Sequence, residues 1–148
     1  MKQKLRLFFR FLLLIWVSFV FLQSLFFKFL GHDETDIMFS TIADWMYSIG
    51  FPDILAQGFK SFGAYMVGGV ELFAVALLWL SRTRLFGALL GILVISGAIF
   101  FHLATPLGID RVINEAGDTD NGALFFMACS VWVSCLFIAV LTGFSRRA

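Results

Sequence analysis

An otherwise apolar segment near the N-terminus, FLQSLFFKFLG, carries an amide, a hydroxyl and an ammonium at Gln23, Ser24 and Lys28. Ser24 and Lys28 are four residues apart, so a helix would place both side chains on one face. Polar groups inside such a segment can bind a ligand headgroup, relay a proton or pair with an opposite charge. Each of these roles needs partners from elsewhere in the chain.

A carboxylate lies in a second apolar segment at Glu71. It comes about nine residues after Phe62, which at 1.5 Å per residue is roughly 14 Å below the outer boundary of a membrane span. A carboxylate near the bilayer centre costs at least about 2.5 kcal/mol, and such acids usually face the bundle interior and mark a functional site. We expect Glu71 to be protonated, hydrated or paired, with Gln23, Ser24 and Lys28 within reach.

Two further side chains belong to the same predicted region. His102 ends a third apolar segment at the same outer level, and Trp16 shares the helix face of Gln23. The flexible stem of Lys28 allows its ammonium either to reach outer water or to bend inward to Glu71. A lone histidine at an interface is more often structural, and for Trp16 packing or lipid contact is favoured over donation to a bound ring. A functional cluster is favoured over a structural clamp, and both stay open.

Other kinds of site are not indicated. His32 and His102 lack a recognised ligand spacing, so we predict neither a metal site nor a haem, and no covalently bound cofactor. The sequence has no glycine-rich phosphate loop and no serine-nucleophile elbow, and its arginines form no nucleic-acid surface. Cys129 and Cys135 are six residues apart on different helix faces, which argues against a redox pair within the chain.

Membrane helices must carry these residues. The chain has 148 residues, of which 60% are hydrophobic and 14% charged, whereas soluble domains are about half apolar. A span needs about 20 apolar residues, and four continuous runs have that length, at approximately 7–29, 62–80, 85–103 and 122–144. They lack the alternation of membrane strands. We predict an all-α polytopic membrane protein, with one domain over residues 1–148 folded as an antiparallel four-helix bundle.

Basic residues predict the orientation of the bundle, because lysine and arginine are retained on the cytoplasmic side of short loops. All the positions used fall on one side, which predicts cytoplasmic N- and C-termini in a bacterial-type inner membrane. The first apolar run is too long for a signal peptide and lacks small residues at its end, so we expect a retained anchor. The positions are Lys2, Lys4, Arg6, Arg10, Arg82, Arg84, Arg146 and Arg147.

The connections between the runs differ in length. The short turn SRTR makes the second and third spans antiparallel neighbours. In the first outer loop, apolar residues recur at helical spacing until Gly50 and Pro52 interrupt the pattern, which predicts a short amphipathic helix on the outer surface or over the bundle. An ordinary connector is favoured over a lid that covers a ligand. The apolar residues are Met38, Ile42, Trp45, Met46 and Ile49.

Small residues predict where helices meet. Gly87 and Gly91 form a GxxxG pattern in the third run, and the same face continues to His102. Such a face allows close approach of another helix. Packing explains most of the small residues in the four runs but does not explain Glu71.

Four segments resemble the DoxX-like membrane proteins: QSLFFKF, GGVELFAVALLWL, GALLGILVISGAIFFHLATPLGI and GDTDNGALF. The resemblance covers nearly the whole chain, in order, and implies a four-helix membrane bundle. It also implies an association with redox or assembly machinery, since the family is named after a subunit of a thiosulfate:quinone oxidoreductase. By motif position it highlights Lys28, Glu71 and His102. It further suggests an outer turn of Asp118, Asn121 and Gly122 that caps the last helix.

Several functions are compatible with these residues. The first is a membrane subunit or accessory factor of a quinone-linked redox system, in which the polar cluster binds a quinone or lipid headgroup or relays a proton. Any enzymatic role would then belong to an oxidoreductase complex with a redox partner protein. The second is a non-enzymatic binding or assembly protein, with a structural cluster and a homo-oligomer as one form. The third is a small oligomeric transporter. The lipid bilayer is a partner in every case, and nucleic acid in none.

Overall fold

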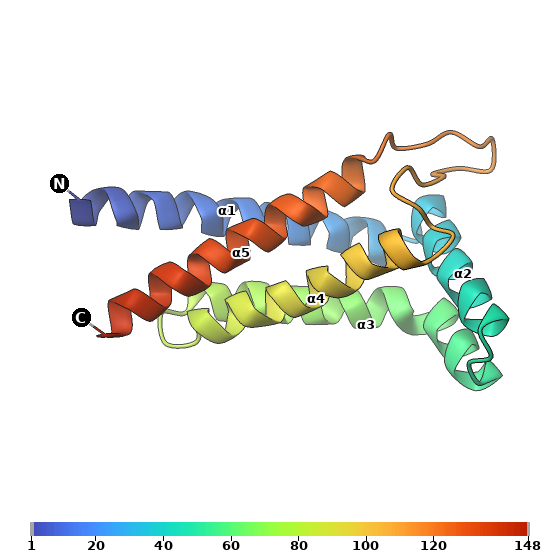
Figure 1. The fold of residues 1–148 in the computed structure, drawn as a ribbon, viewed down its shortest axis with the longest axis horizontal. Coiled ribbons are helices and arrows are strands. Elements are labelled where there is room, and N and C mark those ends of the chain that lie inside the picture. The colour runs from blue at the N-terminus through green and yellow to red at the C-terminus, as the bar shows by residue number, and fades with distance from the viewer. Residues whose placement is uncertain (1, 148) are drawn as a thin grey trace.

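The computed structural model describes residues 2–147, and the side chains of residues 3–143. Within this range the chain is helical, as Figure 1 shows, and the all-α prediction is confirmed. Four of the described helices, α1, α3, α4 and α5, are long and apolar enough to cross a membrane, so the protein is a multi-pass integral membrane protein. The helices are α1 (Lys2–Phe29), α2 (Asp33–Ser48), α3 (Asp53–Trp79), α4 (Arg84–Ala104) and α5 (Ala123–Arg147).

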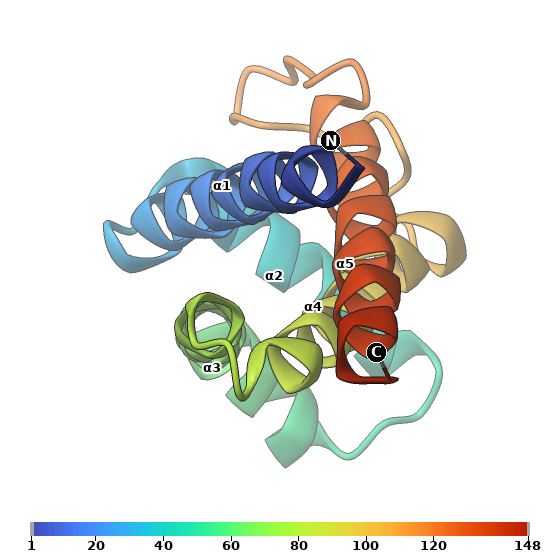
Figure 2. The same cartoon turned by 90° about the vertical axis from the view of Figure 1, so that its left-hand side faces the viewer.

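The four spanning helices form a ring in which α1 and α4 each contact both α3 and α5. Neighbours in the ring run antiparallel, and Figure 2 shows them nearly end-on. Both termini and the α3–α4 turn lie at one end of the bundle, which we call the terminal end (Figure 1). The short helix α2 and the loop of residues 105–122 lie at the other end, which we call the loop end. Chain connections join α1 to α3, α3 to α4 and α4 to α5, whereas α1 and α5 are neighbours through packing alone.

The ends of the bundle differ in charge as the sequence pattern requires. Lys4, Arg6 and Arg10 lie in the first turns of α1, at the same end as the α3–α4 turn that holds Arg82 and Arg84. Three more basic side chains used for the orientation, those of Lys2, Arg146 and Arg147, lie outside the side chains that the structure describes. The assignment of this end to the cytoplasm stays a prediction.

Helix α3 begins at Asp53, nine residues before the predicted start at Phe62. The first turns contain Asp53, Gln57 and Lys60, so the apolar run marks the part of the helix suited to lipid and not the whole helix. This polar extension packs against α2, where the rings of Phe39 and Phe59 are 5.2 Å apart. The other three predicted runs match α1, α4 and α5 closely.

The predicted amphipathic helix is confirmed as α2, which ends at Ser48 before Gly50 adopts a φ of +83°. Its buried face differs from the predicted stripe in part. Ile42 is buried as expected, but Phe39 and Ala43 are buried as well, while Ile49 lies beyond the helix and is exposed. The shift arises because α2 packs on α3 at the loop end of the bundle.

Glycines set the closest helix contacts. A Cβ on Gly87 would lie 2.7 Å from the backbone nitrogen of Leu78, so α3 and α4 touch through their backbones beside their connecting turn. A Cβ on Gly91 would lie 2.9 Å from Sγ of Cys135 in α5. The GxxxG pattern therefore serves two neighbours: Gly87 faces α3, and Gly91 faces α5.

Tryptophan and serine side chains join three of the four neighbouring pairs of spans. The indole Nε1 of Trp16 in α1 donates to Ser130 in α5 at 3.2 Å. Trp79 in α3 donates to Ser18 in α1 at 2.9 Å, and Trp132 in α5 donates to Ser96 in α4 at 3.0 Å. Among the described residues no Trp–Ser hydrogen bond joins α3 to α4, which meet beside their connecting turn at Gly87 and through the rings of Phe59 and Phe101.

We expect Gly87→Ala to destabilise the bundle by about 1–3 kcal/mol, because its methyl group would meet the backbone of α3, which cannot move aside. Gly97→Ala on the same helix is the matched control: a Cβ there meets nothing within 4 Å, and the change should be neutral or slightly stabilising. Thermal unfolding of the two variants in the same detergent measures the difference. Equal unfolding temperatures would contradict the packing role of Gly87.

Candidate functional site

Lys28 and Glu71 form an ion pair inside the bundle. Nζ of Lys28 lies 2.6 Å from both carboxylate oxygens of Glu71 and 2.8 Å from the hydroxyl of Ser24. Lys28 is 7% exposed and Glu71 4%. Of the two alternatives for Lys28, the structure shows the inward one, and Glu71 is accordingly paired.

The local sequence explains how the pair forms. Lys28 lies in the last turn of α1, where the helix dipole favours a positive charge. Gly68 is one turn before Glu71, and a Cβ there would lie 2.7 Å from the ring of Phe29 and 3.0 Å from the side chain of Leu25. The missing side chain lets α1 approach α3 closely enough for the lysine to reach the carboxylate.

A cavity of about 570 Å³ adjoins this pair at the loop end of the bundle. All four spanning helices line it, and its wall is mostly apolar, with side chains such as Phe21, Val67 and Met127. Helix α2 contributes Thr35 and Phe39 to the lining and so covers the cavity from the loop end. The sequence favours a simple connector for α2, and in the structure this helix also lines the cavity.

A second charged cluster lies at the covered end of the cavity. The buried guanidinium of Arg111 donates from Nη2 to Glu34 in α2 at 2.9 Å and from Nε to Asp120 at 3.1 Å. Asp120 also accepts from the backbone nitrogens of Gly122 and Leu124 at the start of α5. Arg111 therefore ties α2 to the loop and to α5, and all three charged side chains line the cavity.

His102 lines the same cavity from α4 and is 3% exposed. Its Nδ1 lies 2.6 Å from the carbonyl oxygen of Gly108. Because a carbonyl oxygen can only accept, Nδ1 holds a proton, so in the neutral form of the ring Nε2 is a hydrogen-bond acceptor. This bond also fixes the ring against the turn that follows α4.

The polar side chains in the cavity wall differ in how many of their hydrogen-bonding groups are already used within the protein. An ammonium has three protons, and Lys28 has three acceptors within 2.8 Å, two from Glu71 and one from Ser24. The amide of Gln23 lines the cavity and has no hydrogen-bond partner among the described residues. The cavity wall therefore offers the Gln23 amide and the His102 ring more readily than the ion pair.

The structure brings together five of the predicted candidates. Gln23, Ser24, Lys28, Glu71 and His102 all line the cavity. Gln23 lines the cavity without a hydrogen bond to Glu71, whose two carboxylate oxygens both lie against the ammonium of Lys28.

The other candidates lie elsewhere. Trp16 is outside the cavity lining, and its indole nitrogen is used by Ser130. The predicted cap of the last helix is wrong in detail. Asn121 and Gly122 do form a turn with positive φ, but the capping carboxylate is that of Asp120, while Asp118 bonds to Asn114 within the loop.

Sequence reasoning missed Arg111, Glu34 and Asp120 as site residues. No role was assigned to any of the three from the sequence. A signal was available: Arg111 is an arginine in a loop that otherwise carries acidic charge, against the trend that excludes basic residues from this side. Such an exception indicates a local partner for the charge.

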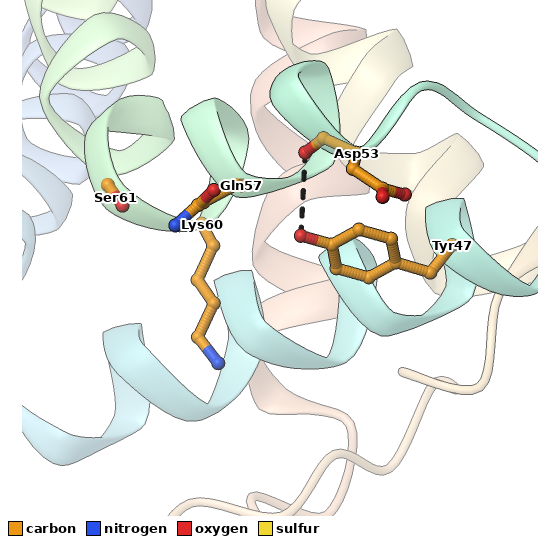
Figure 3. Close-up of a pocket in the computed structure, with 5 residues that line it drawn as sticks. All are labelled: Tyr47, Asp53, Gln57, Lys60 and Ser61. Atoms are coloured by element: carbon orange, nitrogen blue, oxygen red, sulfur yellow. Dashed lines mark hydrogen bonds between the residues drawn. The ribbon is translucent and has the colours of Figure 1, made fainter.

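A second hollow, of about 630 Å³, lies on the surface at the α2–α3 corner. Figure 3 shows its lining, in which the hydroxyl of Tyr47 donates to the backbone carbonyl of Asp53 at 3.4 Å. Its other lining side chains are Gln57, Lys60 and Ser61. All five residues are exposed, so this hollow lacks the buried polar groups of the cavity.

Comparison of the chain with family models, with curated proteins and with solved structures finds no match. Within the described part of the chain, no group of three or more His, Cys, Asp or Glu side chains is placed to hold a metal ion. The arrangement is therefore that of an apolar cavity with buried hydrogen-bonding groups, which suits a neutral ligand with a polar end.

We expect Glu71→Gln to destabilise the protein by about 3–5 kcal/mol, because it leaves the Lys28 ammonium buried without its counter-charge. The double variant Lys28→Met with Glu71→Met removes both charges and should unfold within about 1 kcal/mol of the native protein. Denaturant titration in detergent compares them. A double variant as unstable as the single one would show that the charges themselves, and not their balance, hold the bundle.

We expect Arg111→Met to release α2 from the bundle without unfolding α5. Glu34 would lose its partner, whereas Asp120 would keep its bonds to the first turn of α5. Hydrogen exchange should then become at least about tenfold faster in α2, which corresponds to ~1.4 kcal/mol, with little change at residues 123–130. Lys60→Met, an exposed substitution of the same kind, is the control. Equal acceleration in both helices would argue against a specific link to α2.

Proposed function

We propose that the protein is a membrane-embedded binding protein that serves as a subunit or accessory factor of a quinone-linked redox system. The cavity beside Lys28 and Glu71 takes the headgroup of the quinone, and a partner protein carries out the electron transfer. The observation that carries the proposal is the cavity: an apolar space of about 570 Å³ with buried polar groups at its end.

The chemistry of the wall supports a ring-shaped, uncharged headgroup. The ion pair is internally neutral, so it adds polarity to the wall without demanding a charged ligand. Gln23 can both donate and accept, and His102 can accept, which matches the carbonyl and hydroxyl oxygens of a quinone and its reduced form. Apolar side chains from all four spans surround the remaining space.

The redox assignment depends on the resemblance to the DoxX-like proteins in the segments around Lys28, Glu71 and His102. Those three residues lie far apart in the sequence, yet all three line one cavity. A shared motif at the wall of a single cavity supports a common role in binding. The membership of this chain in the family is part of the proposal.

One observation favours a second role for the pair, as a structural clamp between α1 and α3. All three protons of Lys28 are used within the protein. A polar link of this kind fixes the register of two membrane helices even when nothing binds beside it.

The test is a titration of the purified protein with a short-tailed benzoquinone, for the native protein and the Lys28→Met, Glu71→Met double variant. We expect saturable binding to the native protein and at least about tenfold weaker binding to the double variant. Lys60→Met, a matched change on the exposed face of α3, should bind as the native protein does.

Two results would count against the proposal. No saturable binding to the native protein would exclude a quinone as the ligand. Native affinity in a folded double variant would leave the pair with the clamp role alone. The unfolding temperature of each variant, measured in the same preparation, separates lost binding from lost structure.

A further inference from the structure

The cavity has a wall that faces lipid, between α3 and α4. Two of its lining residues are also among the most exposed apolar side chains of the spanning helices: Met66 in α3 is 68% exposed and Leu93 in α4 is 69% exposed. Val70 and Gly97, one helical turn further along the two helices, line the cavity beside them. We call these four residues the window.

Gly97 faces open space beside the window. A Cβ built on this glycine meets nothing within 4 Å, although the residue lines the cavity. By contrast, a Cβ on Gly87 or Gly91 of the same helix would collide with a neighbouring helix. The three glycines of α4 thus differ. Gly87 and Gly91 allow close contact with neighbouring helices, whereas Gly97 borders open space.

Defined contacts limit the window at both ends. Towards the terminal end, α3 and α4 touch through their backbones at Gly87. Towards the loop end, the rings of Phe59 and Phe101 are 5.7 Å apart, and Trp45 of α2 packs against Phe101 at 6.5 Å. The two helices are therefore held together at both ends of the window.

The α3–α4 pair is also the pair without a Trp–Ser hydrogen bond among the described residues. The other three neighbouring pairs each have one within their spans. The helices beside the window can separate without breaking a buried hydrogen bond at that level. The cavity thus has one lipid-facing side that is both lined by exposed apolar residues and free of such a bond.

We propose that the window is the membrane entrance of the cavity and holds the apolar tail of a single-tailed amphiphile whose headgroup donates a hydrogen bond to Nε2 of His102. The proposal rests on the cavity being a binding site, as in the proposed function, but not on the ligand being a quinone. It adds the route of entry, the position of the tail and the polarity of the headgroup.

The part of the cavity wall at His102 favours a headgroup that donates. The protons of Lys28 are all used, and Nδ1 of His102 donates to Gly108. Nε2 of a neutral His102 ring is an acceptor, and it gains a hydrogen bond only from a ligand that donates. Phenols, quinols and fatty alcohols can donate to Nε2 of His102, whereas their ethers and the oxidised quinones can only accept, for which the wall offers the amide of Gln23.

The first experiment uses an alkylphenol with a photoreactive diazirine in its alkyl chain, added to the protein in lipid nanodiscs. We expect crosslinks at Met66, Val70 and Leu93, mapped by mass spectrometry. The methyl ether of the same probe lacks the donor and should give roughly tenfold less crosslinking at these positions. Crosslinks spread evenly over the lipid-facing sides of all four spans would overturn the window, and equal labelling by the ether would overturn the donor requirement.

The second experiment closes the window. Gly97→Phe places a ring in the open space and should reduce the crosslinking at the three window residues by at least about tenfold. Gly143→Phe is the matched control, because a Cβ there also meets nothing within 4 Å but the residue lies near the terminal end of α5, away from the cavity. Unchanged labelling in a folded Gly97→Phe variant would refute the entrance.

The two proposals fail separately. If the benzoquinone does not bind but the alkylphenol labels the window, the window stands and the quinone is excluded. If the benzoquinone binds to native protein but the alkylphenol labels the window equally in native protein and in folded Gly97→Phe, the cavity stands as a quinone site and the window is excluded as the entrance.

Discussion

The need to neutralise two charges inside the membrane determines much of this structure. The Glu71 carboxylate is in the apolar part of α3, and the only route to a counter-charge within the described contacts is the Lys28 ammonium from α1. That pairing requires α1 to lie close against α3, which in turn requires the missing side chain of Gly68. The mutual position of two helices thus follows from the electrostatic cost of one carboxylate.

The remaining contacts divide the bundle into closed and open interfaces. Small residues and Trp–Ser hydrogen bonds hold three neighbouring pairs of spans, because lipid supplies no hydrophobic force that drives apolar helices together. The α3–α4 pair uses its short turn and the backbone contact at Gly87. With those two helices held at their ends, the middle can carry exposed residues such as Leu93 without loss of the fold.

The sequence predicts those parts of the structure that depend on local physics. Apolar length predicts the spans, and the rarity of an acid in lipid singles out Glu71. The beginning of α3 at Asp53 could not be read from hydropathy, because its first turns are stabilised by α2 and not by lipid. The role of Arg111 was equally hidden, since Glu34 is 77 residues away in sequence and only the fold joins them.

Two charged clusters at one end of a membrane protein differ in what they can do. The Lys28–Glu71 pair joins two rigid spanning helices, so it is suited to a fixed wall. The Arg111 cluster joins the short helix α2 to a loop, and Glu34 is 37% exposed at its side chain, so water can compete for that link. The cover of the cavity is consequently weaker than its wall. A ligand that enters from lipid therefore does not require the cover to open, and the cover can instead exclude water from the polar groups beneath it.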